Sequence, residues 1–341
     1  MKLKSLFMVS LGLVLLSSPV HAGRVVVKLA TVAPPDSTWH QYLQEIDEQW
    51  REISNDQVQL KIYPGTLGDE ADIMRRIRIG QIDAATVSSV GLSTIDPAAT
   101  ALHIPLAFTS YQELDYVRKR ITGPIEEILK QKGLVVLNWG EGGWVRFFTK
   151  TPLQRPADLP EQKLFVWSTG DTTRAEEIWK SVGVKPIPLS SVDILPALQT
   201  GMINAYQAPP LLALANQWFA FSEWMTDMRW APVVGATVIS RRTWEKIPEE
   251  LRPKLLTVTR EAGLRLDARV RKQEQEAIAA MLKRGLKPVT VPPDALKEWQ
   301  ALTKSLYPEI RGKMIPAEYF DRALKLRDEY RAAHGQTSKT L

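Results

Sequence analysis

Residues 77–84 read Ile-Arg-Ile-Gly-Gln-Ile-Asp-Ala, and residues 198–205 repeat the phrase as Leu-Gln-Thr-Gly-Met-Ile-Asn-Ala. Each copy ends an amphipathic stretch with glycine, which fits the left-handed conformation that commonly closes a helix. The apolar run that follows is typical of a buried parallel strand. One such unit in each half predicts two similar α/β lobes, with a ligand in the crevice at the carboxyl ends of their strands. Chance is the competing explanation, because helix–glycine–strand units are common in α/β folds.

The surrounding pattern extends this two-lobed α/β prediction. The chain opens with alternating strands and helices, expected at 25–33, 38–53, 57–63, 69–80 and 82–87. This order favours a parallel sheet with right-handed crossovers. Further strands are expected at 134–137, 163–167 and 231–240. The helical pattern from Pro248 to Gly285 is about 50 Å long at 1.5 Å per residue, too long for one small domain.

We therefore expect the long helix, at about 249–284, to be shared by both lobes, with a bend at Gly263. The first lobe is predicted to comprise 23–143 plus 231–263. The second is predicted to comprise 144–230 plus 264–341.

The first 22 residues have the features of a secretory signal. A basic start precedes an apolar stretch, and Val20-His21-Ala22 is a small-x-small cleavage site. We expect cleavage after Ala22 and export to the periplasm. The chain contains no cysteine, which excludes disulfides, thiolate metal sites and a cysteine nucleophile. The formal net charge is only +6, with interspersed charges and no nucleic-acid motif, so no nucleic-acid partner is expected.

No catalytic, cofactor or metal site emerges from the motifs. His40, His103 and His334 lack ligand spacing, and neither a phosphate-binding glycine loop nor a nucleophile elbow occurs. Glu141, between Trp139 and Trp144, is the best candidate for a general acid, because burial beside aromatic rings raises a carboxyl pKa. Glycoside chemistry requires a second carboxylate, which we do not find. We therefore predict that the protein is not an enzyme and has no cofactor.

Several motifs occur in one order over almost the whole chain after the secretory signal. They are Val27-Lys28-Leu29-Ala30-Thr31, Tyr63-Pro64-Gly65, Leu67-Gly68-Asp69-Glu70, Gly80-Gln81-Ile82-Asp83, Pro156-Ala157-Asp158-Leu159, residues 193–201 and Thr243-Trp244-Glu245-Lys246-Ile247-Pro248. This ordered set resembles the solute-binding proteins of TRAP (tripartite ATP-independent periplasmic) transporters. The resemblance implies two α/β lobes joined by crossing strands and a long helix. It also implies a cleft that closes on a ligand, and membrane partner subunits driven by an ion gradient.

The sequence departs from this family at the ligand site. The resemblance implies that most members bind the substrate carboxylate with an arginine. In this chain the aligned position is Phe165. A second family arginine is retained as Arg146. Ala208 replaces the cleft asparagine, and Ser88 stands where some acid-binding members have an acidic residue. A carboxylate facing Phe165 loses the fixed guanidinium fork, so an acid ligand is disfavoured.

Eleven tryptophans add apolar surface, and several lie near expected strand ends. The predicted ligand-binding residues are Trp39, Ser88, Ser89, Trp139, Glu141, Trp144, Arg146, Phe165, Trp167, Gln207, Pro209 and Trp230. On the second-lobe side the expected cleft wall also includes Ser168. For each tryptophan, packing in the core is the alternative interpretation to contact with a ligand. Arg146 has two equal interpretations, as an anchor for an acid headgroup or as a structural residue paired with Glu141 or another carboxylate.

The prediction from sequence is a periplasmic binding protein that delivers a small apolar or amphiphilic ligand to a TRAP-type transporter. The first alternative is an organic-acid binding protein of the same class that uses Arg146. The second is a periplasmic lipid carrier or sensor module without a transporter, because one fold serves many functions. The sequence leaves monomer and homodimer open.

Overall fold

The computed structural model describes residues 24–167 and 172–335. The expected secretory signal and Ser168 lie outside these residues. The helices are α1 (Thr38–Ser54), α2 (Glu70–Arg78), α3 (Ser89–Ser93), α4 (Tyr111–Gln131), α5 (Thr172–Ser181), α6 (Ile194–Thr200), α7 (Pro210–Ala215), α8 (Arg241–Trp244), α9 (Arg252–Lys283), α10 (Pro293–Ile310) and α11 (Ala317–Ala333). Short 3₁₀ helices occur at Pro97–Thr100, Pro156–Glu161, Ser191–Asp193 and Trp218–Phe221. No helix among the described residues is both long and apolar enough to cross a membrane.

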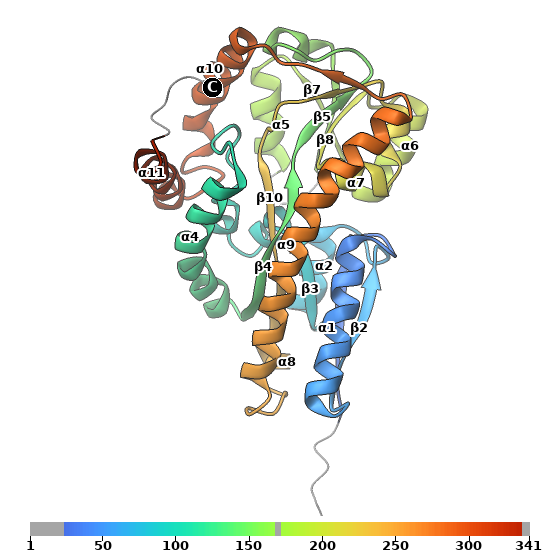
Figure 1. Ribbon diagram of the computed structural model, residues 1–341, viewed down its shortest axis with the longest axis vertical. Helices are drawn as coiled ribbons and strands as arrows, with labels where there is room; N and C mark the ends of the chain where they lie inside the picture. Colours follow the sequence, from blue (N-terminus) through green and yellow to red (C-terminus); the bar gives the residue numbers. More distant parts are fainter. Residues whose placement is uncertain (1–23, 168–171, 336–341) are drawn as a thin grey trace, which may run out of the picture.

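Two separate β-sheets form the centres of two lobes (Figure 1). The first has the order β2 (Val58–Pro64), β1 (Val25–Thr31), β3 (Ala84–Ser88), β10 (Pro232–Ser240) and β4 (Leu134–Trp144). The second has the order β11 (Lys287–Val289), β9 (Trp224–Thr226), β5 (Arg146–Thr149), β8 (Ala205–Ala208), β6 (Lys163–Trp167) and β7 (Lys185–Leu189). Strands β1, β2 and β3 are parallel, as are β6, β7 and β8. The predicted two-lobed α/β fold is confirmed.

The repeated phrase has the same structural role in each lobe. Gly80 and Gly201 follow α2 and α6 with φ of 74° and 70°, the left-handed conformation expected at a helix end. In the first lobe, the Asp83 carboxylate accepts from the Lys28 backbone N at 3.0 Å, and the Asp83 N donates to the Lys28 carbonyl at 2.9 Å. In the second lobe, Asn204 exchanges the same two bonds with Lys163, at 2.7 and 3.1 Å. An Asp or Asn at this position therefore fixes where the next parallel strand begins.

Three segments join the lobes. Strand β4 of the first sheet continues through Val145 into β5 of the second, and the chain returns from β9 to β10. Helix α9 runs along both lobes (Figure 1) and packs on α1 and β4 in one and on α7 in the other. A Cβ at Gly263 would stand 2.6 Å from the Asn138 amide nitrogen. The glycine thus permits close packing of α9 on β4, a reason other than the bend that we expected.

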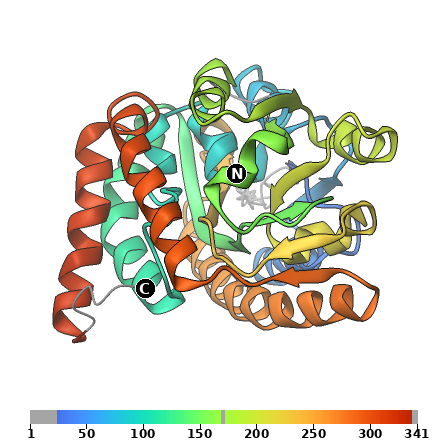
Figure 2. The ribbon, with the colours of Figure 1, turned by 90° about the horizontal axis from the view of Figure 1, so that it is seen from above.

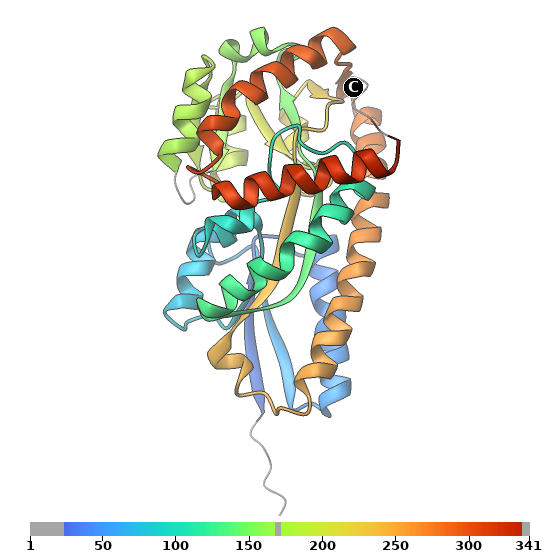
Figure 3. The ribbon, with the colours of Figure 1, turned by 90° about the vertical axis from the view of Figure 1, so that its left-hand side faces the viewer.

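The C-terminal helices form a fourth connection. Helix α10 anchors in the second lobe through Trp299, which is fully buried beside Phe147 and Trp230. Helix α11 packs on α4 of the first lobe, with Phe320 and Ala323 in that lobe's core. Figures 2 and 3 show both helices along one side of the molecule. The sequence analysis assigned 264–341 to the second lobe, but α11 packs in the first. The other lobe boundaries stay a prediction.

Candidate functional site

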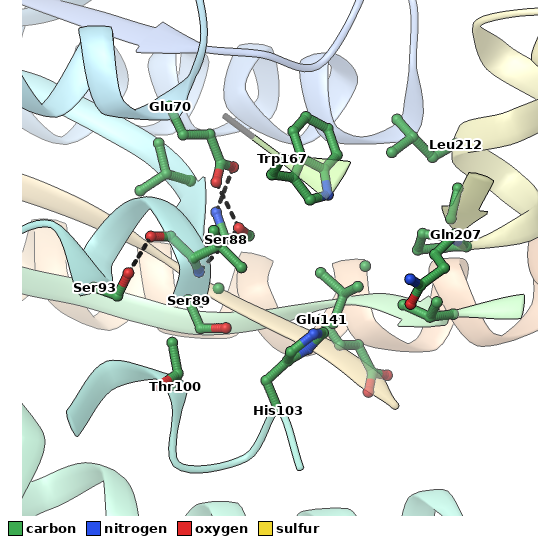
Figure 4. A pocket seen from close by; sticks show the side chains of 18 of the residues that line it. Glu70, Ser88, Ser89, Ser93, Thr100, His103, Glu141, Trp167, Gln207 and Leu212 are labelled. Carbon is green, nitrogen blue, oxygen red and sulfur yellow. Dashed lines mark hydrogen bonds between the residues drawn. The ribbon is translucent and has the colours of Figure 1, made fainter. Parts of the chain in front are cut away.

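A cavity of about 610 Å³ lies between the lobes, where the carboxyl ends of their parallel strands meet. Thr31 at the end of β1 and Ser88 at the end of β3 line it from the first lobe. Trp167 at the end of β6 and Gln207 in β8 line it from the second. Figure 4 shows Ser88, Trp167 and Gln207 around this space. The two copies of the repeated phrase thus place equivalent strand ends on opposite walls.

A buried carboxylate organises the first-lobe wall. Glu70 accepts hydrogen bonds from the Ser88 backbone N at 2.7 Å, the Ser88 hydroxyl at 2.5 Å and the Gly91 N at 3.0 Å (Figure 4). Burial raises the pKa of Glu70, and these three bonds oppose the rise. Ser88 also caps α3 by accepting from the Val90 N at 3.2 Å. The Val90 and Gly91 backbone donors at the start of α3 are therefore already satisfied by the side chains of Ser88 and Glu70.

The opposite wall is aromatic. Phe165 is only 2% exposed and packs in the second lobe's core, where its ring makes an edge-to-face contact with the Trp167 ring at a centroid distance of 4.9 Å. The alternation along β6 places Phe165 and Trp167 on one face, as expected. Trp167 is half-buried and presents the larger surface to the cavity. This wall offers apolar area where the resemblance implies a guanidinium.

Glu141 joins a buried charge network beside the cavity. Its Oε1 accepts from the Arg271 Nε, while Arg271 also binds Asp115 and the Glu141 backbone N donates to Asp267 at 3.0 Å. Arg118 completes the network by bridging Asp115 and Asp267, at 3.1 and 2.6 Å. The network ties α4, β4 and α9 together near the strand that crosses between the lobes. Glu141 Oε2 is buried without a hydrogen-bond partner among the described residues.

Burial raises the pKa of Glu141 to about 7, although the Arg271 bond opposes the rise. Because this folded-state pKa exceeds the unfolded value, the protonated carboxyl favours folding below about pH 4.5, and this contribution is lost as pH rises towards 7. Glu141→Gln is expected to remove that loss. The difference in unfolding free energy between the variant and the wild-type protein should therefore grow in favour of the variant by up to about 3 kcal/mol from pH 5 to pH 8. Urea unfolding measures this, with the exposed Glu48→Gln as control. An equal difference at both pH values would contradict the assignment.

The cavity brings together nine of the twelve residues predicted from sequence. They are Trp39, Ser88, Ser89, Glu141, Phe165, Trp167, Gln207, Pro209 and Trp230. Their contact with a ligand remains a prediction. Trp139, Trp144 and Arg146 are placed elsewhere, outside the cavity lining.

Each of these three residues has a structural partner instead. The Trp139 Nε1 donates to Glu126 at 2.9 Å. Trp144 is fully buried in the first lobe's core, with the Tyr111 ring at 5.7 Å. The Arg146 guanidinium donates to the backbone carbonyls of Thr226 and Asp227. Arg146 therefore orients the β9–β10 segment, through carbonyl groups rather than through the Glu141 carboxylate that we considered.

The cavity also has residues that the sequence analysis missed. Glu70, His103 and Lys313 line it, together with Ile178 and Trp179 of α5 and a group from α10 and the turn after it. The His103 Nδ1 lies 3.1 Å from the Pro232 carbonyl, and burial lowers the pKa of this imidazole. The apolar spacing of Leu302, Leu306 and Ile310 indicates an amphipathic helix. It does not reveal which surface that helix covers.

The family model for bacterial extracellular solute-binding protein, family 7, matches residues 29–313. The chain is 25% identical over 260 residues to the 2,3-diketo-L-gulonate-binding periplasmic protein of Escherichia coli K12, covering 74% of this chain and 76% of that protein. The resemblance drawn from the sequence motifs is confirmed by these matches.

Solved structures show the same fold. A TRAP periplasmic solute-binding protein from Sulfurospirillum deleyianum with bound succinate superposes with a TM-score of 0.81 at 20% identity, over 89% of this chain and 99% of that one. A second such protein, from Ralstonia eutropha H16 with bound (S)-2-acetolactate, superposes with a TM-score of 0.83 at 22% identity. The match covers 90% of this chain and 99% of that one. The chain therefore belongs to family 7 of the bacterial extracellular solute-binding proteins, the periplasmic binding proteins of TRAP transporters.

Proposed function

We propose that the protein captures a small molecule whose buried part is uncharged and largely apolar, and delivers it to TRAP membrane subunits. The delivery step follows from the family. The ligand class rests on the charges that line the cavity. Among the described lining residues these are two carboxylates, Glu70 and Glu141, and one cation, Lys313.

That distribution disfavours a small acid. Lys313 is exposed and its Nζ already pairs with Glu309 at 2.6 Å, so it gives little net attraction to a carboxylate. Glu70 accepts from the Ser88 hydroxyl and from the Ser88 and Gly91 backbone N–H groups, so these three donors are not available to an anion at the start of α3. A dianion in the cavity would lose its hydration without gaining a buried cation. Burial of apolar surface against Trp39, Trp167 and Trp230 suits a lipid-like or ring-containing molecule.

A second candidate is the binding of an organic acid. The bound succinate and acetolactate of the related structures favour it, as does the diketogulonate of the Escherichia coli relative. The anchor that we first considered, Arg146, is held by backbone carbonyls outside the cavity lining. The acid would then depend on Lys313.

Calorimetric titration of the wild-type protein distinguishes the candidates. We expect succinate and D-galacturonate to give no binding tighter than about 1 mM, which corresponds to only about 4 kcal/mol. Lys313→Gln should change neither result, with Lys304→Gln, an exposed lysine of α10, as the matched control. Micromolar binding of either acid that is lost in Lys313→Gln or Arg146→Gln, but kept in Lys304→Gln, would establish the acid candidate instead.

A further inference from the structure

The cavity extends beyond the strand ends to the side of the molecule where α10 passes. Six apolar side chains line this extension, which we call the α10 pocket. They are Ile178 and Trp179 of α5, Leu306 and Ile310 of α10, and Met314 and Ile315 of the following turn. Figure 3 shows α10 and α11 on this side, over the junction of the lobes. The α10 pocket therefore combines a surface of the second lobe with one of the C-terminal connection.

The strand ends and α10 differ in the polar groups that they offer a ligand. Ser88, Ser89 and Gln207 lie at the strand ends (Figure 4). Near the α10 pocket, the polar lining residues of α10 and its turn are Thr303 and Lys313. The Thr303 hydroxyl donates to the Trp299 carbonyl of its own helix at 3.0 Å, and Lys313 pairs with Glu309. Both groups are engaged, so α10 and its turn offer a ligand mainly apolar contact.

The apolar walls of the α10 pocket are only partly covered by the protein. Ile178, Trp179, Leu306 and Met314 are all half-buried, whereas Ile310 and Ile315 are buried. Ile178 and Met314 pack against the first lobe's core, and Trp179 packs against that of the second, with the Trp230 ring at 5.9 Å. Apolar surface in such a recess gains free energy when an apolar group replaces water.

We propose that the solute is elongated, with a hydrogen-bonding end at Ser89 and Gln207 and an aliphatic or ring-containing tail in the α10 pocket. This inference rests on the proposed ligand class and adds where each end of the ligand lies. A volume of about 610 Å³ is room for about 20 water molecules at about 30 Å³ each. A four-carbon diacid fills a small part of that space.

A chain-length series tests the tail directly. Titration calorimetry with 1-hexanol, 1-octanol and 1-decanol uses neutral probes that differ only in apolar length. Each added pair of methylenes should tighten binding about fifteenfold, at about 0.8 kcal/mol per methylene, until the α10 pocket is full.

Leu306→Trp fills the α10 pocket, and Leu264→Trp is the matched control because Leu264 is 68% exposed and outside the cavity lining. We expect Leu306→Trp to abolish the gain from octanol to decanol, and Leu264→Trp to keep it. Leu306→Ala, which enlarges the same pocket, should move the best chain length upwards. Thermal unfolding of all three variants checks that they are folded. If Leu306→Trp does not fold, Leu306→Ala still tests the α10 pocket.

The two proposals fail in different ways. If the alcohols bind with the expected length dependence, but Leu306→Trp and Leu306→Ala behave like Leu264→Trp, the tail lies elsewhere and only the α10 pocket is overturned. If no alcohol binds the wild-type protein, the apolar ligand class is overturned, and the placement of its tail with it.

Discussion

Phe165→Arg is expected to destabilise the protein by about 3–5 kcal/mol, because it places an unpaired charge where a 2% exposed ring now packs. The ring lies in the second lobe's core with Ile194, Leu198 and Tyr206, and none of these side chains offers a carboxylate. Placing at this position the arginine that the resemblance implies therefore does not by itself create an acid site. Urea unfolding measures the loss.

Trp167→Arg is the control for this substitution. Trp167 lies on the same face of β6, two residues further on, but it is half-buried at the cavity edge, where a long side chain can direct its charge to water. We expect it to lose less than half as much stability as Phe165→Arg. A Phe165→Arg protein that is as stable as wild type and binds succinate would show that the aromatic wall alone excludes acids.

Gly235→Ala is expected to cost about 3 kcal/mol of stability and to weaken ligand binding at least tenfold. Gly235 pairs with Ser88 across β10 and β3, and an added Cβ would overlap the Val87 carbonyl oxygen and stand 3.0 Å from the Ser88 Cα. Both are backbone atoms, so the strands themselves must separate. That separation moves Ser88 away from Glu70 and distorts the first-lobe wall of the cavity.

Gly123→Ala is the matched control. Gly123 lies in α4, and its added Cβ would meet nothing within 4 Å beyond its two chain neighbours and the backbone of its own helix. The gain from reduced backbone freedom, about 0.5–1 kcal/mol, is opposed by crowding between the new Cβ and the ring of Pro124, so the stability should stay within about 0.5 kcal/mol of wild type. Urea unfolding should therefore show a large loss for Gly235→Ala and little change for Gly123→Ala. Equal stabilities would mean that β3 and β10 are not held at the register that builds the wall.

The sequence predicted those features that depend on local pattern. The glycine and the Asp or Asn of the repeated phrase carry a backbone conformation and a strand contact that few other residues provide, so the two lobes were predictable. The α/β pattern predicted the strand ends, which led to Trp167, and the family resemblance added Ser88 and the segment with Gln207. For these residues the position in the chain largely determines the position in the cavity.

Features that depend on side-chain direction or on distant packing were not predictable. Trp144 and Arg146 flank the crossover at Val145, where the chain leaves one sheet for the other, so strand alternation alone does not say which way they face. The amphipathic pattern of α10 shows one apolar face, and the contact between that face and α5 depends on the tertiary fold. Glu70 begins α2, and its bonds to Ser88 join segments 18 residues apart.

Native mass spectrometry of the protein isolated from the periplasm of its own cells, followed by solvent extraction of the bound molecule, tests the central claim most directly. We predict a one-to-one adduct that dissociates on denaturation and partitions into the organic solvent as an elongated, mainly apolar compound. A small hydrophilic acid recovered in the aqueous phase as the stoichiometric ligand would contradict the proposed ligand class and establish the organic-acid alternative.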